Sequence, residues 1–291
     1  MSNQNYRDDA TVQTAIRNLF AGSAPERPTD LDQLWQLLGP RFQLTGDVHE
    51  GERFVMEAGA YRYVRFNHRA VRAFWLAGFI AWEGYRAVAE STTLNIVDLT
   101  RFKGMLNTFD AMISSDDPAL EPLPAGVAEP GVFPDRRADP QGRAAAELAT
   151  IATGWALLHE VRHIKHQQEG TSADPHEVCP TNRRNEELSC DRYATTFLLE
   201  QVDVYARAEN VEPARVVQKR QLGIYFALFA LTVLAKDKWT ASNTHPAVQE
   251  RIDAVQAVMK PHRSEVADAI AHAAFAALRA LWPSAPCPSF D

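Results

Sequence analysis

The segment His159-Glu160-Val161-Arg162-His163 carries the residues best suited to chemistry, in the pattern His-Glu-x-x-His. Residues four apart on a helix project from one face, so both imidazoles can reach a single metal ion. Glu160 then points toward a ligand of that metal, where its carboxylate can take a proton from water. The spacing therefore predicts a zinc (Zn) site with a general base beside it.

A catalytic zinc ion needs a third protein ligand, and Glu187 follows His163 after 23 intervening residues. Asp191 lies one helical turn beyond it, so Glu187 is expected to bind the metal while Asp191 accepts a hydrogen bond from a liganding histidine. The alternatives are that Glu187 only complements the dipole of its helix from the first turn and that Asp191 is a simple surface carboxylate. The neighbouring Glu186 is expected only to complement the helix dipole.

Two further side chains are candidates for donating a hydrogen bond in the transition state. Tyr193 is one, although an aromatic residue at this spacing is also typical of a helix core. His245 is the other, and its alternative is to precede a helix that begins at Pro246. His166, three residues after His163, is an alternative third ligand or a solvated histidine.

The helix that must carry the His-Glu-x-x-His pattern is predicted over residues 140–168. Asp139 and Pro140 suit its N-cap and first position, and Gly170 can end it. One apolar stripe follows helical spacing through Leu148, Ile151, Trp155 and Leu158. Further helices are expected over residues 186–208, with Asn185 as the cap, and over 213–236, 246–259 and 265–282.

The N-terminal half predicts helices within residues 10–38, interrupted by Pro25 and Pro28, and helical patterns from Val71 to Trp82 and from Ile96 to Phe109. Between them, β-forming runs at 53–57 and 61–66 flank Ala58-Gly59-Ala60 and predict a small antiparallel hairpin. By fold analogy this hairpin is a candidate wall of a substrate cleft.

Residues 118–140 hold six of the 17 prolines and cannot form a long helix or a central strand. They are expected to be a linker, or equally a loop packed over a single domain. The expected division is therefore an N-terminal helical region with a hairpin (1–117), this Pro-rich loop or linker, and a helical metal-binding region (141–291). One domain overall is the alternative.

Charge and composition exclude several classes of protein. Thirty Lys and Arg against 37 Asp and Glu give a net charge of -7, the wrong sign for gripping nucleic acid or an anionic membrane. The longest uncharged apolar run, 222–235, has 14 residues, too few to cross a bilayer. A polar N-terminus and three cysteines without a Cys-x-x-Cys pair favour the cytoplasm.

The chain resembles the gluzincin metallopeptidases in its pattern His159-Glu160-x-x-His163 followed by Glu187-x-x-x-Asp191. The sequence from Cys190 to Leu199 strengthens this resemblance. Among them the chain looks most like the phage-exclusion protease Lit family, over roughly residues 140–200. The resemblance implies a mainly α (α+β) zincin-like helical metallopeptidase with a small antiparallel β-sheet. It also implies a cytosolic zinc endopeptidase of phage defence, cleaving a host protein such as a translation factor once an activating peptide binds.

Other resemblances remain open. Thr244-His245-Pro246 with Glu250-Arg251-Ile252 is similar to a segment of the HtpX and CAAX-protease family, whose members are usually membrane-embedded. The ImmA/IrrE type of regulatory metallopeptidase also has a helix rich in Glu, Ala and Leu after His-Glu-x-x-His. A non-catalytic helical scaffold or partner protein is the alternative from another class. Metal content separates that alternative from the zinc-peptidase interpretation.

Overall fold

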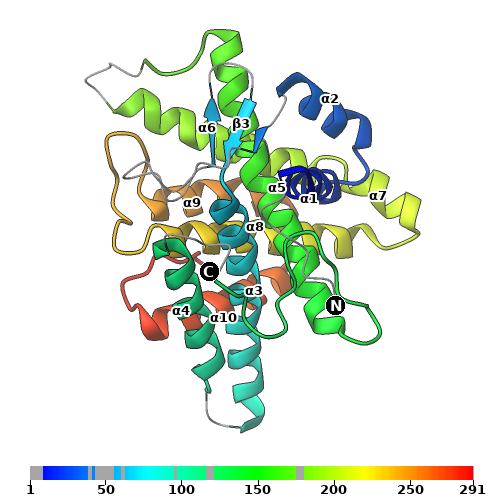
Figure 1. Cartoon of the computed structure of the whole chain (residues 1–291), viewed down its shortest axis with the longest axis vertical. Coiled ribbons are helices and arrows are strands. Elements are labelled where there is room, and N and C mark those ends of the chain that lie inside the picture. Colours follow the sequence, from blue (N-terminus) through cyan, green and yellow to red (C-terminus); the bar gives the residue numbers. More distant parts are fainter. Residues whose placement is uncertain are drawn as a thin grey trace.

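The computed structural model describes residues 9–38, 41–42, 56–59, 63–94, 97–115, 121–174 and 180–290. Most of this part is helical (Figure 1). The helices are α1 (Asp9–Ser23), α2 (Pro28–Leu38), α3 (His68–Leu94), α4 (Thr100–Ser114), α5 (Pro140–Glu169), α6 (Thr181–Leu199), α7 (Val202–Glu209), α8 (Pro213–Leu234), α9 (Val248–Met259) and α10 (Glu265–Leu281), with a 3-10 turn at Lys260–His262. The predicted fold class, mainly α with a small sheet, is confirmed.

The sheet contains β1 (Arg41–Phe42), β2 (Met56–Gly59) and β3 (Tyr63–Phe66) in the order β1-β3-β2. β2 pairs antiparallel with β3, as the hairpin prediction expected, whereas β1 pairs parallel with β3. Ala58 and Gly59, assigned to the turn by the sequence, are strand residues paired with Val64 and Tyr63. Residues 53–55 and 60–62 of the predicted hairpin lie outside the described ranges.

Helix α5 runs through the middle of the molecule and packs against α1, α3, α6 and α8 (Figure 1). Its buried residues occur on all sides and not only along the predicted stripe, because neighbours surround it. Asp139 caps its N-terminus by accepting a hydrogen bond from the Gly142 N–H, and Gly170 ends it in the left-handed conformation with φ 69°. The caps predicted for this helix are therefore confirmed.

Glycines allow neighbouring helices to approach α5 closely. A Cβ atom at Gly154 would overlap the Ser23 side chain of α1. A Cβ at Gly78 of α3 would lie 2.8 Å from the Ala149 Cβ, and one at Gly223 of α8 would overlap Ile151. These contacts fix the axis of the helix that carries the His-Glu-x-x-His pattern.

We expect Gly154→Ala to destabilise the protein by about 1–3 kcal/mol, because the added methyl has no room beside Ser23. Gly104→Ala in α4 is the matched control: nothing lies within 4 Å of its Cβ position, so the change is expected to stabilise by about 0.5–1 kcal/mol. Thermal and urea unfolding of the two variants measure the contrast. Equal stabilities would contradict a tight α1–α5 contact.

Two predicted helix boundaries are wrong. Helix α6 begins at Thr181 after Pro180, so Asn185 lies inside the helix and does not cap it. The helix predicted over 186–208 is split between α6 and α7. Near the split, Arg27 donates a hydrogen bond to the Phe197 carbonyl (3.2 Å), which satisfies one of the carbonyls left open where a helix ends.

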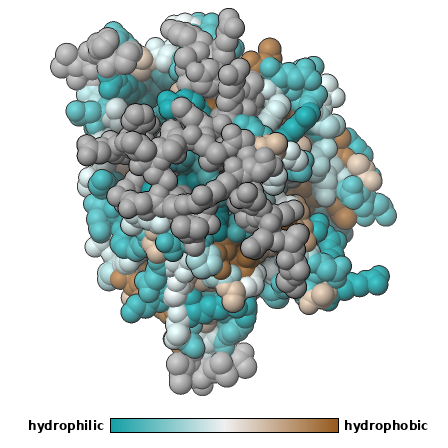
Figure 2. Space-filling view, in the orientation of Figure 1, coloured by the Kyte–Doolittle hydropathy of each residue, from teal (hydrophilic) through white to brown (hydrophobic). Residues whose placement is uncertain are grey.

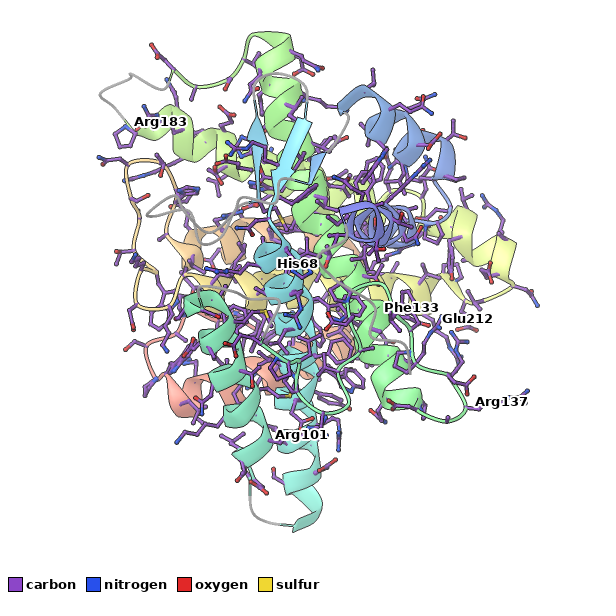
Figure 3. All side chains as sticks on the ribbon, viewed as in Figure 1. His68, Arg101, Phe133, Arg137, Arg183 and Glu212 are labelled. Atoms are coloured by element: carbon purple, nitrogen blue, oxygen red, sulfur yellow. The ribbon has the colours of Figure 1, made fainter. Side chains whose placement is uncertain are left out.

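The described part of the Pro-rich segment, 121–139, is a loop packed on helices. The Trp75 indole N–H of α3 donates to the Ala128 carbonyl (2.7 Å), and Arg72 pairs with Glu129 at 3.0 Å. Phe133 of the same loop, labelled in Figure 3, stacks edge-on against Trp75. The loop lies against α3, and the division of the chain into domains stays a prediction.

Hydrophilic residues make up much of the coloured surface in Figure 2, with scattered apolar ones. No helix in the described ranges is long and apolar enough to cross a membrane. The predicted apolar run at 222–235 falls mainly within α8, whose side chains there are largely buried in the core.

Candidate active site

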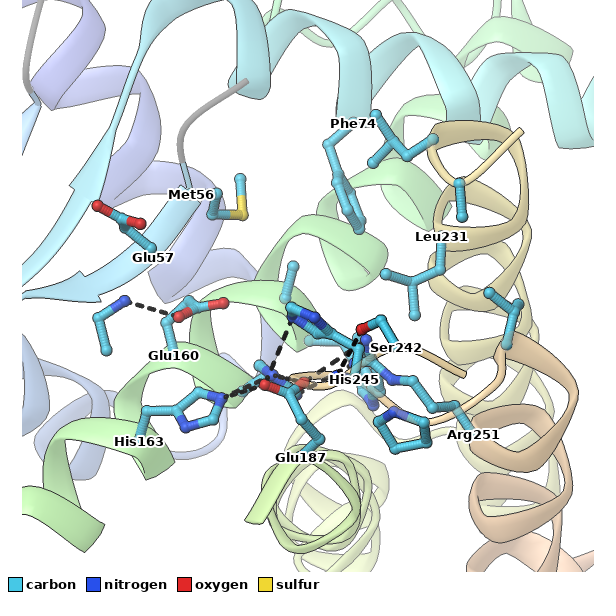
Figure 4. A pocket seen from close by; sticks show the side chains of 18 of the residues that line it. Met56, Glu57, Phe74, Glu160, His163, Glu187, Leu231, Ser242, His245 and Arg251 are labelled. Carbon is cyan, nitrogen blue, oxygen red and sulfur yellow. Dashed lines mark hydrogen bonds and ion pairs between the residues drawn. The ribbon is translucent and has the colours of Figure 1, made fainter. Parts of the chain in front are cut away.

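Helices α5 and α6 lie side by side, and their facing side chains form one end of a cleft of about 710 Å³ (Figure 4). α5 contributes His159, Glu160 and His163, and α6 contributes Glu187. The loop between α8 and α9 contributes His245. Residues that the sequence singled out from three separate segments therefore meet in one cavity.

The ring nitrogens of His159 and His163 converge with the Glu187 carboxylate. The two Nε2 atoms are 3.2 Å apart, and the Glu187 oxygens lie 3.4 Å from His159 Nε2 and 3.3 Å from His163 Nε2. In a tetrahedral zinc site with ligand distances of about 2.0–2.2 Å, the ligand atoms lie about 3.3–3.6 Å apart. Each of these distances has the spacing of two neighbouring ligands in such a site, with Glu187 Oε2 facing His159 and Oε1 facing His163, so the three side chains could hold a zinc ion.

A second donor set includes Cys190. Its Sγ lies with ring nitrogens of His159 and His163 in a group whose atoms are all within 4.8 Å of one another. Burial raises the pKa of the Cys190 thiol to about 11, so it carries its proton at neutral pH. Burial also disfavours the charge on Glu187, but the two histidines outweigh it and lower the carboxyl pKa. Glu187 is thus the donor already ionised.

Both histidines are held by carboxylates at their outer nitrogens. His159 Nδ1 donates to Asp191 Oδ1 and His163 Nδ1 donates to Glu186 Oε1, each at 2.8 Å. These bonds leave both Nε2 atoms facing the cleft, the arrangement that fixes a metal-binding tautomer. Although burial lowers it, the pKa of the His159 imidazole is raised overall by Asp191 and Glu187, and that of His163 is raised by Cys190 together with Glu186 and Glu187. The negative charges of Glu186, Glu187 and Asp191 favour a cation bound between the two histidines.

Glu186 has more than the dipole role expected from the sequence. Besides His163, its carboxylate accepts hydrogen bonds from the Ala173 N–H (2.6 Å) and the Ser172 hydroxyl (3.2 Å). Adjacent helix residues point about 100° apart, so Glu186 and Glu187 reach opposite nitrogens of the same imidazole. The spacing of Glu186 and Asp191 on α6 could have suggested one carboxylate partner for the outer nitrogen of each histidine.

Arg251 of α9 was not singled out by the sequence, although it belongs to the Glu250-Arg251-Ile252 segment. Its Nε and Nη2 bind the two Asp191 oxygens at 2.8 and 2.6 Å, a bidentate pair deep in the protein. Burial raises the pKa of Asp191, but Arg251 outweighs it and lowers that pKa overall. Arg251 therefore keeps Asp191 ionised to receive the His159 hydrogen bond.

The β-sheet holds the Glu160 side chain in place through a backbone hydrogen bond. Its Oε2 accepts a hydrogen bond from the Ala58 N–H of β2 at 2.8 Å, and burial raises the pKa of its carboxyl group. Met56, Glu57 and Ala58 all line the cleft, and β2 is an edge strand of the sheet described here. Strand β2 of the predicted hairpin thus forms a wall of this cavity.

His245 reaches the site through a braced loop. Its Nε2 lies 3.6 Å from Glu187 Oε1, and its Nδ1 forms a 2.7 Å hydrogen bond with the Thr244 hydroxyl. Arg184 of α6 donates twice to the Ser242 carbonyl, at 3.0 and 2.8 Å. The structure therefore brings His245 beside Glu187, with the α8–α9 loop tied to the start of α6.

Tyr193 and His166 do not join the converging side chains of His159, His163 and Glu187. The Tyr193 hydroxyl accepts a hydrogen bond from Lys165 (3.1 Å), and the ring does not line the cleft. His166 bonds the Thr171 hydroxyl through Nδ1 (2.8 Å) and the Ser189 hydroxyl through Nε2 (3.1 Å). Both of its nitrogens are engaged and its side chain is buried, so it is not the solvated histidine of the sequence prediction.

We expect His166→Ala to leave zinc affinity within about 3-fold of wild type and to lower stability by about 1–2 kcal/mol, because it removes hydrogen bonds between α5 and α6. Chelator titration and thermal unfolding measure the two effects separately. Loss of the metal in this variant would instead make His166 a ligand.

No curated protein and no solved structure matches the chain significantly. The family model described as Peptidase U49 matches residues 64–274, a range that runs from β3 into α10. The match includes His159, Glu160, His163, Glu187 and His245, which line the cleft together. Because the match covers well over half of the 291 residues, the chain belongs to the Peptidase U49 family.

Proposed function

We propose that this peptidase is a zinc-dependent endopeptidase whose metal is held by His159, His163 and Glu187. The observation that carries the proposal is the convergence of two imidazole Nε2 atoms and one carboxylate at 3.2–3.4 Å, with Glu160 beside them. Two histidines and a glutamate are a known ligand set of catalytic zinc. A bound polypeptide would lie in the cleft along β2.

The donor chemistry fits zinc. The outer nitrogens of both histidines are engaged by Asp191 and Glu186, which leaves neutral Nε2 donors once a cation replaces the proton. When bound, zinc supplies a Lewis acid that polarises the scissile carbonyl and makes water a nucleophile near neutral pH. Cys190 is the alternative third donor, and its raised thiol pKa works against it.

Glu160 is proposed as the general base. The Ala58 N–H holds its Oε2, which orients the carboxylate and leaves Oε1 to accept a proton from the attacking water. Burial raises its pKa, so after accepting the proton it can donate it to the leaving amine. Proton transfer by one carboxylate in both directions thus completes hydrolysis of the peptide bond.

His245 is proposed to donate a hydrogen bond to the oxygen of the scissile carbonyl as negative charge develops on it. Its Nε2 is on the cleft side of the ring, 3.6 Å from Glu187, while Nδ1 is engaged by Thr244. The bracing of its loop by Arg184 reduces the motion of this donor. Tyr193 lies outside the cleft and has no part in the proposal.

Metal removal tests the zinc assignment. We expect the purified chain to hold about one zinc ion, and we expect a chelator to abolish peptide hydrolysis that added zinc restores. Metal analysis and hydrolysis of a denatured protein mixture provide the readouts. Undiminished hydrolysis after complete removal of zinc would contradict the proposal, and a chain that binds no zinc and cleaves nothing would favour the scaffold alternative.

We propose phage defence in the cytoplasm as the biological role, supported by the Lit-family resemblance of residues 140–200. Low basal activity, an activating peptide and a host substrate such as a translation factor belong to this proposal. The described part of the Pro-rich loop, 121–139, contributes none of the residues that line the cleft. Phage challenge of cells expressing wild type or Glu160→Gln tests the role, and equal phage yields would contradict it.

A further inference from the structure

The cleft has an apolar half that the proposed chemistry does not use. Leu231, Leu234 and Ala235, at the end of α8, line it with half-buried side chains. The spacing i, i+3 and i+4 places them on one face of the helix. Phe74 from α3 and Met56 from β2 complete the walls, and Figure 4 shows Met56, Phe74 and Leu231 surrounding the space beside Glu160 and Glu187.

Helix α5 lines this apolar half and also carries His159 and Glu160. Trp155 and Ala156 line it, and they lie one helical turn before His159 and Glu160 on the same faces of α5. A side chain resting on Ala156 would therefore lie next to the groups that act on the peptide bond. The small methyl of Ala156 leaves room at this point.

The carboxylates of Glu160 and Glu187 disfavour an acidic side chain directly beside them, while the basic residues Lys238 and Arg251 line other parts of the same cleft. Glu160 and Glu187 are the nearest charged neighbours of the apolar half along α5 and α6, and the wall residues Phe74, Leu231 and Leu234 offer no hydrogen-bonding group. Against these three apolar walls a charged or amide side chain would lose its hydration without gaining a hydrogen bond from them. An apolar side chain gains from burial.

Building on the proposed peptidase function, we propose that this apolar half binds a large apolar side chain, such as Leu, Ile, Met or Phe, of a residue directly flanking the scissile bond. The substrate class is a polypeptide with such a residue in an extended segment. Burying a side chain of this size is expected to favour it over alanine by about 10- to 100-fold.

Cleavage-site profiling tests the proposal with a proteome-derived peptide library. Wild type is expected to enrich large apolar residues at one of the two positions flanking the cut. Leu231→Trp fills the pocket and should shift that position toward Gly, Ala and Ser. Leu37→Trp is the matched control, because Leu37 is 70% exposed on α2, away from the cleft. Cleavage without apolar enrichment, or an unchanged profile in Leu231→Trp, would overturn the proposal while leaving the peptidase intact.

A binding measurement separates this proposal from the zinc chemistry. N-acetyl amides of Phe, Leu, Ala and Asp are tested by saturation-transfer NMR on protein without added metal. We expect the Phe and Leu amides to bind at least about 10-fold more tightly than the others, and Leu231→Trp, but not Leu37→Trp, to abolish this preference. If nothing is cleaved, this result alone supports the pocket, and equal binding of all four amides overturns it.

Discussion

Glu160→Gln is expected to lower kcat/KM for peptide hydrolysis by about 10²- to 10⁴-fold, the usual contribution of a general base. The amide keeps the shape of the side chain and can still accept the hydrogen bond from the Ala58 N–H. It cannot take a proton from water, so the loss should appear in catalysis and not in folding. Zinc content and melting temperature are expected to match wild type.

Glu57→Gln is the matched control for this substitution. Glu57 also lines the cleft, but its side chain is exposed and pairs with Arg65 at 2.9 Å. Removing its charge changes the electrostatic field of the cleft without touching the proposed base, so hydrolysis should change by less than about 5-fold. If Glu160→Gln cleaves as fast as Glu57→Gln, Glu160 is not the base and the mechanism is wrong.

Local spacing was enough to predict the central features of the site. The His159 and His163 pair depends only on the four-residue repeat of one helix, and the start and end signals of that helix are themselves local. Glu187 and Asp191 follow the same rule on α6. These positions meet in the structure because α5 and α6 pack along their length.

Contacts between distant segments were not predictable in the same way. Arg251 reaches Asp191 across 60 positions of the chain, and Ala58 reaches Glu160 across 102. No periodicity encodes such pairs, since each depends on how whole helices and the sheet are placed. The two-residue strand β1 is likewise too short to carry an alternating pattern. The sequence therefore predicted which side chains converge in the cleft better than the long-range contacts of Arg251 and Ala58 that hold them.

The carboxylates of α6 should differ in their effect on zinc binding. Glu187→Gln is expected to weaken zinc affinity by more than about 100-fold, because it replaces a proposed anionic ligand by a neutral amide. Glu186→Gln and Asp191→Asn should each cost about 10–100-fold, the range for groups that orient a liganding histidine. Competitive chelator titration of the three variants gives the ranking.

The structure and the sequence lead to different predictions for the effect of Glu186→Gln on zinc affinity. As a group that only complements the helix dipole, Glu186 would tolerate substitution with almost no change in zinc affinity. As the acceptor of the His163 Nδ1 hydrogen bond at 2.8 Å, it should behave like Asp191, its counterpart on His159. An unchanged affinity in Glu186→Gln would mean that His163 is oriented without this bond.

Two controls complete the ranking. Glu169→Gln, at the end of α5 and paired with Arg162, removes a carboxylate from the same helix as the histidines and should leave affinity unchanged. Cys190→Ser tests the other donor set, in which the thiol would be the third ligand. If Cys190→Ser loses the metal while Glu187→Gln retains it, the ligands are His159, His163 and Cys190. Since the thiol would then have to ionise on binding, zinc affinity would also rise more steeply with pH than a carboxylate ligand allows.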